Sequence, residues 1–178
     1  FGQGIARSLL TKIIQIADNQ SLPVRLVSSA QNLDSFSLYT RQGFSPIQAF
    51  QDMYLEIPKE GLALEIPDEY QISSAKLKDV EDMVVLEKKL CGIDRGKDFQ
   101  YFIENKREIW RTMMCRDSKG KLVGFLASVD HPASRIIGPG VSENEEVALI
   151  LLRHLLDSFR GKCPLFLLPV TSQKAVQT

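Results

Sequence analysis

The chain has 178 residues, of which 44% are hydrophobic, and its 22 basic and 22 acidic side chains give a formal net charge of zero. This apolar content is enough for a packed core and excludes a disordered chain, while the length suits one domain of ordinary size or two small ones. The balanced charge argues against nucleic acid or an anionic membrane as a partner, and no apolar run approaches the roughly 18 residues that cross a bilayer.

The first expected element is a helix over residues 3–19 that begins among small residues. Glycine and alanine leave the backbone N–H groups at the positive end of a helix dipole accessible, which suits a phosphate. A Gly-x-Gly pair alone is more often only a turn. The candidate anion site comprises Gly2, Gly4 and Ala6 together with the backbone of Gln3, Ile5 and Arg7. One face of the helix is an apolar stripe formed by Ile5, Leu9, Ile13 and Ile16.

A buried strand is expected at residues 24–29, followed by a helix over residues 32–42. Asn32 is a suitable N-cap for this helix, and Gly43 supplies a left-handed stop. The spacing of three and then four residues places Asn32, Ser35 and Tyr39 on one face. Taken alone, this pattern describes a capped amphipathic helix whose tyrosine is half-buried.

The order of these elements resembles the GNAT-superfamily N-acetyltransferases. Their later helix reads Asn-x-x-(Ala/Ser)-x-x-Leu-Tyr-x-x-x-Gly-Phe, and residues 32–44 match this motif at every named position. Their acetyl-CoA loop reads Arg/Gln-x-x-Gly-x-Gly/Ala, in which Gly4 and Ala6 match while Phe1 stands where Arg or Gln is usual. The resemblance covers residues 1 to about 56.

The resemblance implies an N-acetyltransferase that passes an acetyl group from acetyl-CoA to an amine of a small molecule or peptide by direct attack, without a metal. It makes Tyr39 the general acid that protonates the departing thiolate of CoA. A phenol has an ordinary pKa of about 10 and a thiol one of about 8.5, so Tyr39 is protonated and can donate to the sulfur. It also implies that residues 2–7 bind the pyrophosphate, that Asn32 contacts the cofactor, and that Ser35 is a small residue allowing close approach. The alternative for Tyr39 is a packing role.

A strand is expected at residues 48–55, and a segment rich in proline and glycine follows it. The expected domain boundary therefore lies near residue 60. Residues 1–60 are interpreted as the C-terminal half of a GNAT acetyltransferase domain, and residues 66–178 as a second GNAT-like domain that is incomplete at its C-terminus. Because the chain starts inside a motif and without Met, the sequence is expected to be a fragment.

The predicted fold class is α+β with a mixed sheet, because the second unit follows the opening strand and helix order of the GNAT fold. The second unit also overlays the first at an offset of about 140 residues, which suggests a duplicated domain. This arrangement is similar to tandem GNAT proteins with a degenerate GNAT-like C-terminal domain, and residues 92–95 are similar to a Gly-x-Asp-Arg element of that domain. The expected elements are strands at 70–72, 109–115, 122–129, 135–139 and 164–168, and helices from 74 or 76 to 90, at 98–106 and 143–159, and from 172.

Charged residues distinguish the second unit from the first. Its counterpart of the acetyl-CoA helix begins with Glu143, Glu145 and Glu146, which place negative charge where a pyrophosphate would bind. The second unit is therefore expected not to bind CoA. At the corner between its first two helices, Asp94 and Arg95 are expected to form an ion pair.

Cysteine and histidine usage gives no metal site. The three cysteines are odd in number and far apart, which fits a reducing cytoplasm and neither a disulfide framework nor a Cys-x-x-Cys pair. Neither histidine has metal partners nearby in the sequence. The competing function is a non-catalytic binding or regulatory module built from two GNAT-like units, which Phe1 in the acetyl-CoA loop and the degenerate second unit favour.

Overall fold

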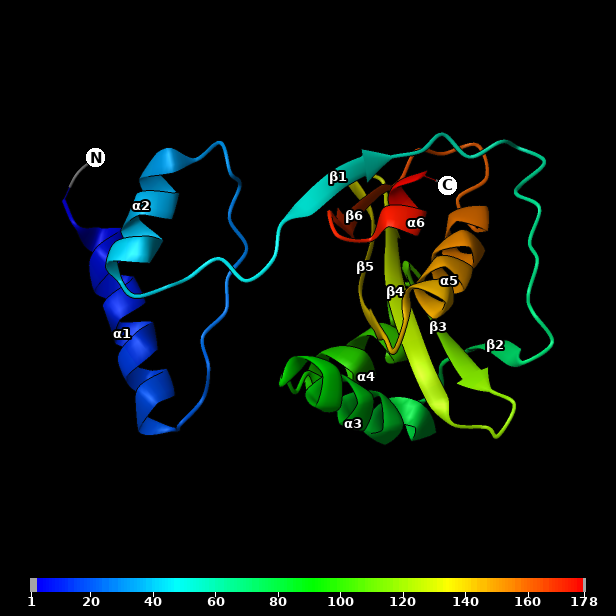
Figure 1. The fold of residues 1–178 in the computed structure, drawn as a ribbon, viewed down its shortest axis with the longest axis horizontal. Coiled ribbons are helices and arrows are strands. Elements are labelled where there is room, and N and C mark those ends of the chain that lie inside the picture. Colours follow the sequence, from blue (N-terminus) through cyan, green and yellow to red (C-terminus); the bar gives the residue numbers. More distant parts are fainter. Residues whose placement is uncertain (1–2, 178) are drawn as a thin grey trace. The chain divides into compact units, whose positions relative to one another are not determined.

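The structure is a computed structural model that describes residues 3–177 (Figure 1). The chain forms two compact units, which divide between Gln48 and Ala49. The predicted boundary near residue 60 lies further along the chain, beyond a strand, β1 (Phe50–Tyr54), that belongs to the second unit.

The first unit contains two helices, α1 (Ile5–Asn19) and α2 (Leu33–Arg41), both within their predicted ranges. They lie side by side, and the Thr11 hydroxyl donates a hydrogen bond of 3.1 Å to the Gln42 amide oxygen (Figure 1). The strand predicted at residues 24–29 is wrong, since this segment has no regular secondary structure. A strand needs a neighbour for its N–H and C=O groups, and none of the strands within residues 3–177 pairs with this segment.

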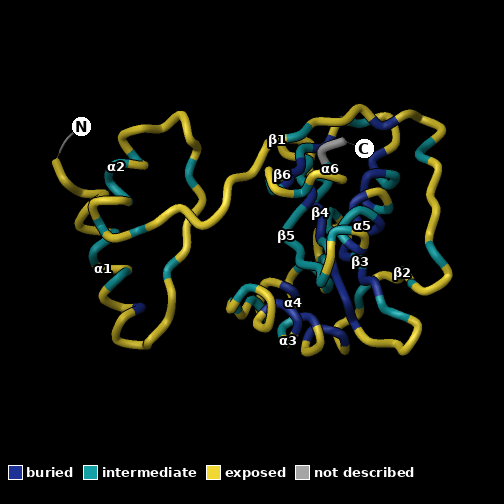
Figure 2. The backbone as a smooth tube through the Cα atoms, in the orientation of Figure 1, coloured by how far each residue is buried: buried dark blue, intermediate teal, exposed yellow. Residues whose placement is uncertain are grey.

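The apolar stripe of α1 is exposed. In Figure 2 much of this helix has the colour of exposed residues. The exposed fractions of Ile5, Leu9, Ile13 and Ile16 are 62%, 61%, 51% and 48%. Ala17 is the buried residue of this helix. The periodicity of the sequence therefore identifies an apolar face, but α2 covers little of it.

The second unit is built on a six-stranded mixed sheet in the order β1-β6-β5-β4-β3-β2, which confirms the predicted α+β class. All neighbouring strands are antiparallel except β5 and β6, which are parallel. Its other strands are β2 (Tyr70–Ser74), β3 (Trp110–Asp117), β4 (Leu122–His131), β5 (Ser134–Ser142) and β6 (Leu165–Pro169). Its helices are the short η1 (Leu77–Asp79), α3 (Val80–Cys91), α4 (Gly96–Glu104), α5 (Glu145–Asp157) and α6 (Gln173–Gln177).

Helices cover both faces of this sheet. Successive residues of a strand point to opposite faces. Met114 accordingly packs into a cluster with α3 and α4, around Phe99 and Phe125, while the next residue, Cys115, packs against Val147 of α5. Burial, followed by the charge of the nearby Asp117, raises the pKa of the Cys115 thiol to about 11, so this cysteine is a core residue in its protonated form.

Strand β1 completes one side of the sheet by pairing antiparallel with β6, from Phe50 opposite Pro169 to Tyr54 opposite Leu165. Only two residue pairs, at Ile136 and Ile137, join the parallel strands β5 and β6. Beyond Ile137, β5 pairs with β4 alone, so the sheet opens between β5 and β6.

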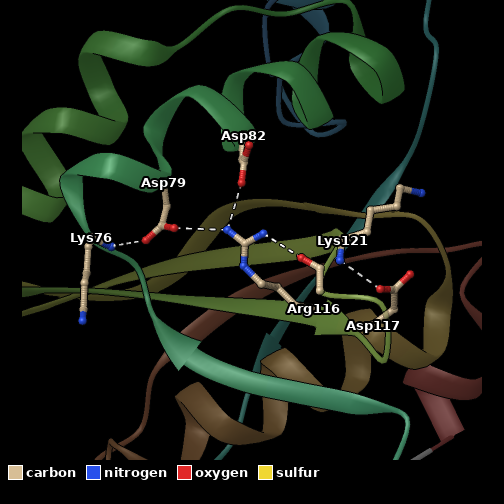
Figure 3. Close-up of polar contacts among 7 residues, drawn as sticks. Lys76, Asp79, Asp82, Arg116, Asp117 and Lys121 are labelled. Atoms are coloured by element: carbon tan, nitrogen blue, oxygen red, sulfur yellow. Dashed lines mark hydrogen bonds and ion pairs between the residues drawn. The ribbon is translucent and has the colours of Figure 1, made fainter.

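A charged cluster fastens the start of α3 to the β3–β4 hairpin (Figure 3). Arg116 donates to Asp82 at 2.9 Å and to Asp79 at 3.1 Å, and Asp79 also accepts from the Lys76 backbone N–H at 2.9 Å. The hydrogen bond to Asp82 is the main cause of the raised pKa of Arg116. In the hairpin, the Asp117 carboxylate accepts from the backbone N–H groups of Lys119 and Lys121, which fixes the turn between the two strands.

Candidate functional site

The helix that carries Tyr39 has the cap and the stop that the sequence predicts. The Asn32 side-chain oxygen accepts from the Ser35 backbone N–H at 3.1 Å, which satisfies one of the free donors at the start of α2. After the helix, Gly43 has a positive φ of 89°, a conformation that costs glycine little. Both predictions are confirmed.

The turn at Gly43 places the end of the motif against the candidate catalytic residue. The Phe44 backbone N–H donates to the Tyr39 carbonyl at 3.1 Å, and the two rings meet edge to face with centroids 6.1 Å apart. Tyr39 is half-buried. Packing within the first unit therefore fixes the Tyr39 ring, independently of any catalytic role of its hydroxyl.

An open hollow of about 540 Å³ lies at the start of α2, and its lining includes Asn32. Ser35, one turn further on, is half-buried and lies outside this lining. Asn32 thus combines a capping role with a position beside a concave surface. The remaining lining residues are Ser29, Gln31, Leu33 and Asp34.

The start of α1 is open. Gly4 precedes the helix with a φ of 74°, and its carbonyl accepts from the Ser8 backbone N–H at 3.0 Å. No side chain caps this helix start, and its first turn contains no acidic residue. The predicted residues Gln3, Ile5, Ala6 and Arg7 are all exposed, as is Gly4, whereas Gly2 lies outside the described residues. Exposed N–H groups and an uncompensated helix dipole favour an anion at this position.

The start of α5, which corresponds to the start of α1 in the first unit, is capped by a side chain. The Asn144 side chain accepts from the Val147 backbone N–H at 2.9 Å, and the Glu145 carboxylate accepts from the Ala175 N–H of α6 at 3.2 Å. Just before the helix, Glu143 accepts from Lys121 at 2.8 Å and from Lys89 at 2.9 Å. These two hydrogen bonds, that of Lys121 first, lower the pKa of Glu143 and keep a carboxylate there. The Asn144 amide oxygen thus occupies a backbone donor at this helix start, and the nearby Lys89 and Lys121 are paired with Glu143.

The corner between α3 and α4 differs from the sequence prediction. Arg95 pairs with Glu87, through its Nε at 2.9 Å and also through Nη2, whereas Asp94 accepts from the Gly96 backbone N–H at 3.3 Å. The predicted Asp94–Arg95 pair is therefore wrong, because Asp94 caps its own turn. Glu87 is 0% exposed, and sequence reasoning missed it because it precedes two lysines on what reads as a solvated helix face.

Within residues 3–177, no group of three or more potential ligand side chains is arranged to hold a metal ion. None of the helices in this range has the length and apolar content that a membrane crossing requires. Within the described residues, the candidate site thus consists of a polar hollow beside α2 and a helix start at α1 that no side chain caps. The start of α5, in contrast, is capped by a side chain.

A family model described as an acetyltransferase (GNAT) domain matches residues 83–178, more than half of the chain. The protein therefore belongs to this GNAT acetyltransferase domain family. The matched range lies in the second unit and does not include Tyr39, Asn32 or the start of α1. A search of curated protein sequences gives no match.

Solved structures share the fold over nearly the whole chain. A GCN5-related N-acetyltransferase from Sphaerobacter thermophilus is 14% identical with a TM-score of 0.56, over 95% of this chain and 60% of that one. A GCN5-related N-acetyltransferase from Kribbella flavida is 12% identical with a TM-score of 0.57, over 96% of this chain and 42% of that one. A probable N-acyltransferase from Enterococcus faecalis V583 is 12% identical with a TM-score of 0.54, over 94% of this chain and 43% of that one. The chain thus spans 60% or less of the length of these three proteins.

Proposed function

We propose that this protein is an N-acetyltransferase that transfers an acetyl group from acetyl-CoA to an amine of a small molecule or peptide in the cytoplasm. Membership of the GNAT family supports acyl transfer. The observation that carries the assignment of the site to the first unit is the open start of α1, which has neither a side-chain cap nor an acid in its first turn.

In this proposal, the backbone of residues 2–7 binds the pyrophosphate, with Arg7 close enough in sequence to add its charge, and residues 3–7 are exposed. Asn32 contacts the cofactor while it caps α2, and Ser35 is small enough to let the cofactor approach. The amine nitrogen attacks the thioester carbonyl carbon, and the bond from that carbon to sulfur breaks. Tyr39 donates its phenolic proton to the leaving sulfur, and the amine loses its proton to water.

The second unit is proposed to be a degenerate GNAT-like domain in a tandem arrangement, without a CoA site of its own. Support comes from Glu143, Asn144 and Glu145, whose side chains are already bonded to nearby lysines and helix N–H groups. A non-catalytic role, the competing function for the whole protein, is thus assigned to this unit alone. In this proposal, the second unit retains a sheet that opens between β5 and β6, but it has lost the anion site at the helix start.

Replacing Gly4 with Asp is expected to weaken acetyl-CoA binding by at least ten-fold, about 1.4 kcal/mol. The substitution places a carboxylate at the open helix start, where it would meet the like charge of the pyrophosphate. Isothermal titration calorimetry of the full-length protein measures the change. Gly120→Asp is the matched control, because Gly120 has a similar φ of 77° and equally open surroundings, but lies in the β3–β4 hairpin. If wild type and Gly4→Asp bind acetyl-CoA with equal affinity, the start of α1 is not the cofactor site.

Titration of the isotope-labelled full-length protein with CoA is expected to shift the backbone amide signals of residues 3–7 and to leave those of residues 142–147 in place. The reason is the contrast between the open start of α1 and the occupied start of α5. The first set of signals serves as the internal control for binding. Saturable shifts at residues 142–147 would mean that the second unit has a cofactor site and is not degenerate.

A further inference from the structure

Strand β1 lies at one end of the sheet of the second unit, with β6 on one side and no strand of the described residues on the other. Opposite residues of an antiparallel pair alternate between those that exchange hydrogen bonds and those whose N–H and C=O groups point away from the partner strand. The Val170 N–H donates to the Ala49 carbonyl at 3.1 Å, so this pair is of the first kind. By alternation, the N–H and C=O groups of Phe50, Asp52 and Tyr54 point to the open edge.

The side chains of these three residues share one face of the sheet, because alternate residues of a strand do. The intervening Met53 packs against the core cluster to which α5 contributes, so the three side chains point to the opposite face. There, Phe50 is 50% exposed and Tyr54 is 67% exposed. Leu167, which lies opposite Asp52 on β6, is 45% exposed. The open edge is therefore bordered by apolar side chains on this face.

Natural proteins usually protect an edge strand with a lysine, a proline or a β-bulge. The strand Phe50–Tyr54 contains neither of these residue types, and its pairing with β6 has no register shift. The Asp52 carbonyl accepts from the Gln51 side-chain amide at 3.2 Å, an exposed bond that the N–H of an added strand would replace. The backbone of β1 is thus regular and open to a further strand.

The charge of Asp52 determines which strand fits. Within the described residues, no side chain pairs with its carboxylate, which lies between the two aromatic side chains along the strand. A second copy of β1, paired antiparallel over the whole strand, would place Asp52 opposite Asp52. Like charges directly opposite one another are destabilising, whereas an opposite charge is favourable. The edge therefore favours a strand with a basic residue flanked by apolar residues two positions away on each side.

We propose that the open edge of β1 binds an extended basic peptide segment of a partner protein as an additional antiparallel strand. The backbone of the segment would pair with Phe50, Asp52 and Tyr54, and its Lys or Arg would lie opposite Asp52. Its apolar side chains would contact the two aromatic rings. The strand belongs to the second unit and lies outside the residues assigned to acetyl transfer, so this inference does not depend on the proposed function.

The probe is the acetylated and amidated peptide Thr-Val-Thr-Lys-Thr-Val-Thr, added to the isotope-labelled full-length protein. At about ten times its Kd, the peptide is expected to slow hydrogen exchange at the amides of Phe50, Asp52 and Tyr54 by about ten-fold. The amides of Gln51 and Met53 face β6 and are the internal control, since adding a strand leaves their exchange unchanged. Absence of this alternating protection, or its presence before the peptide is added, would overturn the proposal.

A charge swap tests the role of Asp52. Replacing the lysine of the peptide with glutamate is expected to weaken binding to the wild type by about ten-fold, measured by NMR titration. Asp52→Lys is expected to reverse this preference and to bind the glutamate peptide more tightly, a gain that misfolding cannot produce. Asp68→Lys, which alters another exposed acid of the same unit, is the control and keeps the preference of the wild type. Equal binding of the two peptides to the wild type, or an unchanged preference in Asp52→Lys, contradicts a basic strand opposite Asp52.

Discussion

Tyr39→Phe is expected to lower the turnover number by about a hundred-fold and to change the affinity for acetyl-CoA by less than about two-fold. A positioned general acid acts as the sulfur leaves, so its loss affects the chemical step far more than cofactor binding. The substitution removes the hydroxyl and keeps the ring that meets Phe44 edge to face, so the packing of α2 is preserved. Steady-state kinetics with an amine that the wild type acetylates, together with calorimetry for acetyl-CoA, measure the two effects.

Tyr54→Phe provides the matched control for this substitution. Tyr54 is 67% exposed and lies on β1, in the second unit, so loss of its hydroxyl is expected to leave turnover unchanged. A Tyr39→Phe variant that turns over at the wild-type rate would make Tyr39 a packing residue. Loss of acetyl-CoA affinity without loss of turnover at saturation would place its hydroxyl in cofactor binding instead.

Local features of the fold were predictable from the sequence, because the residues that determine them are close together in the chain. Asn32 and Gly43 define the start and the stop of α2 through their own hydrogen bond and backbone conformation. The β3–β4 hairpin likewise follows from Asp117, whose carboxylate bonds to the N–H groups of its own turn. In such cases neighbouring residues supply both partners of each contact.

Features that depend on distant partners were not predictable. The apolar segment at residues 24–29 has the composition of a strand, but composition does not supply the neighbour that a strand requires. For β1 the strand itself was predicted, yet its pairing with β6 could not be read from residues 48–55. The sequence-based boundary near residue 60 followed the prolines of the next segment and not this pairing.

The candidate site likewise has local features, which were predictable from the sequence, and features that depend on distant residues, which were not. The motif at residues 32–44 identifies Tyr39 and Asn32 because their spacing is local, whereas the roles proposed for them rest on family resemblance. Glu143, Glu145 and Glu146 in the sequence indicated that the start of α5 is closed, but the hydrogen bond from Ala175 to Glu145 comes from a distant segment.

Arg95→Met is expected to lower the free energy of unfolding of the second unit by about 3 kcal/mol, the lower end of the range for breaking a buried ion pair. Arg95 holds the carboxylate of Glu87, which is fully buried and has a second oxygen without a partner. Removal of Arg95 would leave that charge in the core between α3 and α4, whereas the lost contact of the guanidinium with the Phe99 ring, 5.7 Å away, is minor. Urea denaturation followed by the fluorescence of Trp110, which reports on the second unit alone, measures the loss.

The cause of this loss can be separated from the loss of packing by a second substitution at Glu87. The double variant Glu87→Leu/Arg95→Met removes the unpaired buried charge. It is expected to recover most of the lost stability, because an apolar pair of similar volume can replace a buried ion pair. Lys106→Met is the surface control, since the Lys106–Glu104 pair is exposed and its loss is expected to cost less than about 1 kcal/mol. If the double variant is no more stable than Arg95→Met alone, the aliphatic stem of Arg95 and not its charge stabilises the corner.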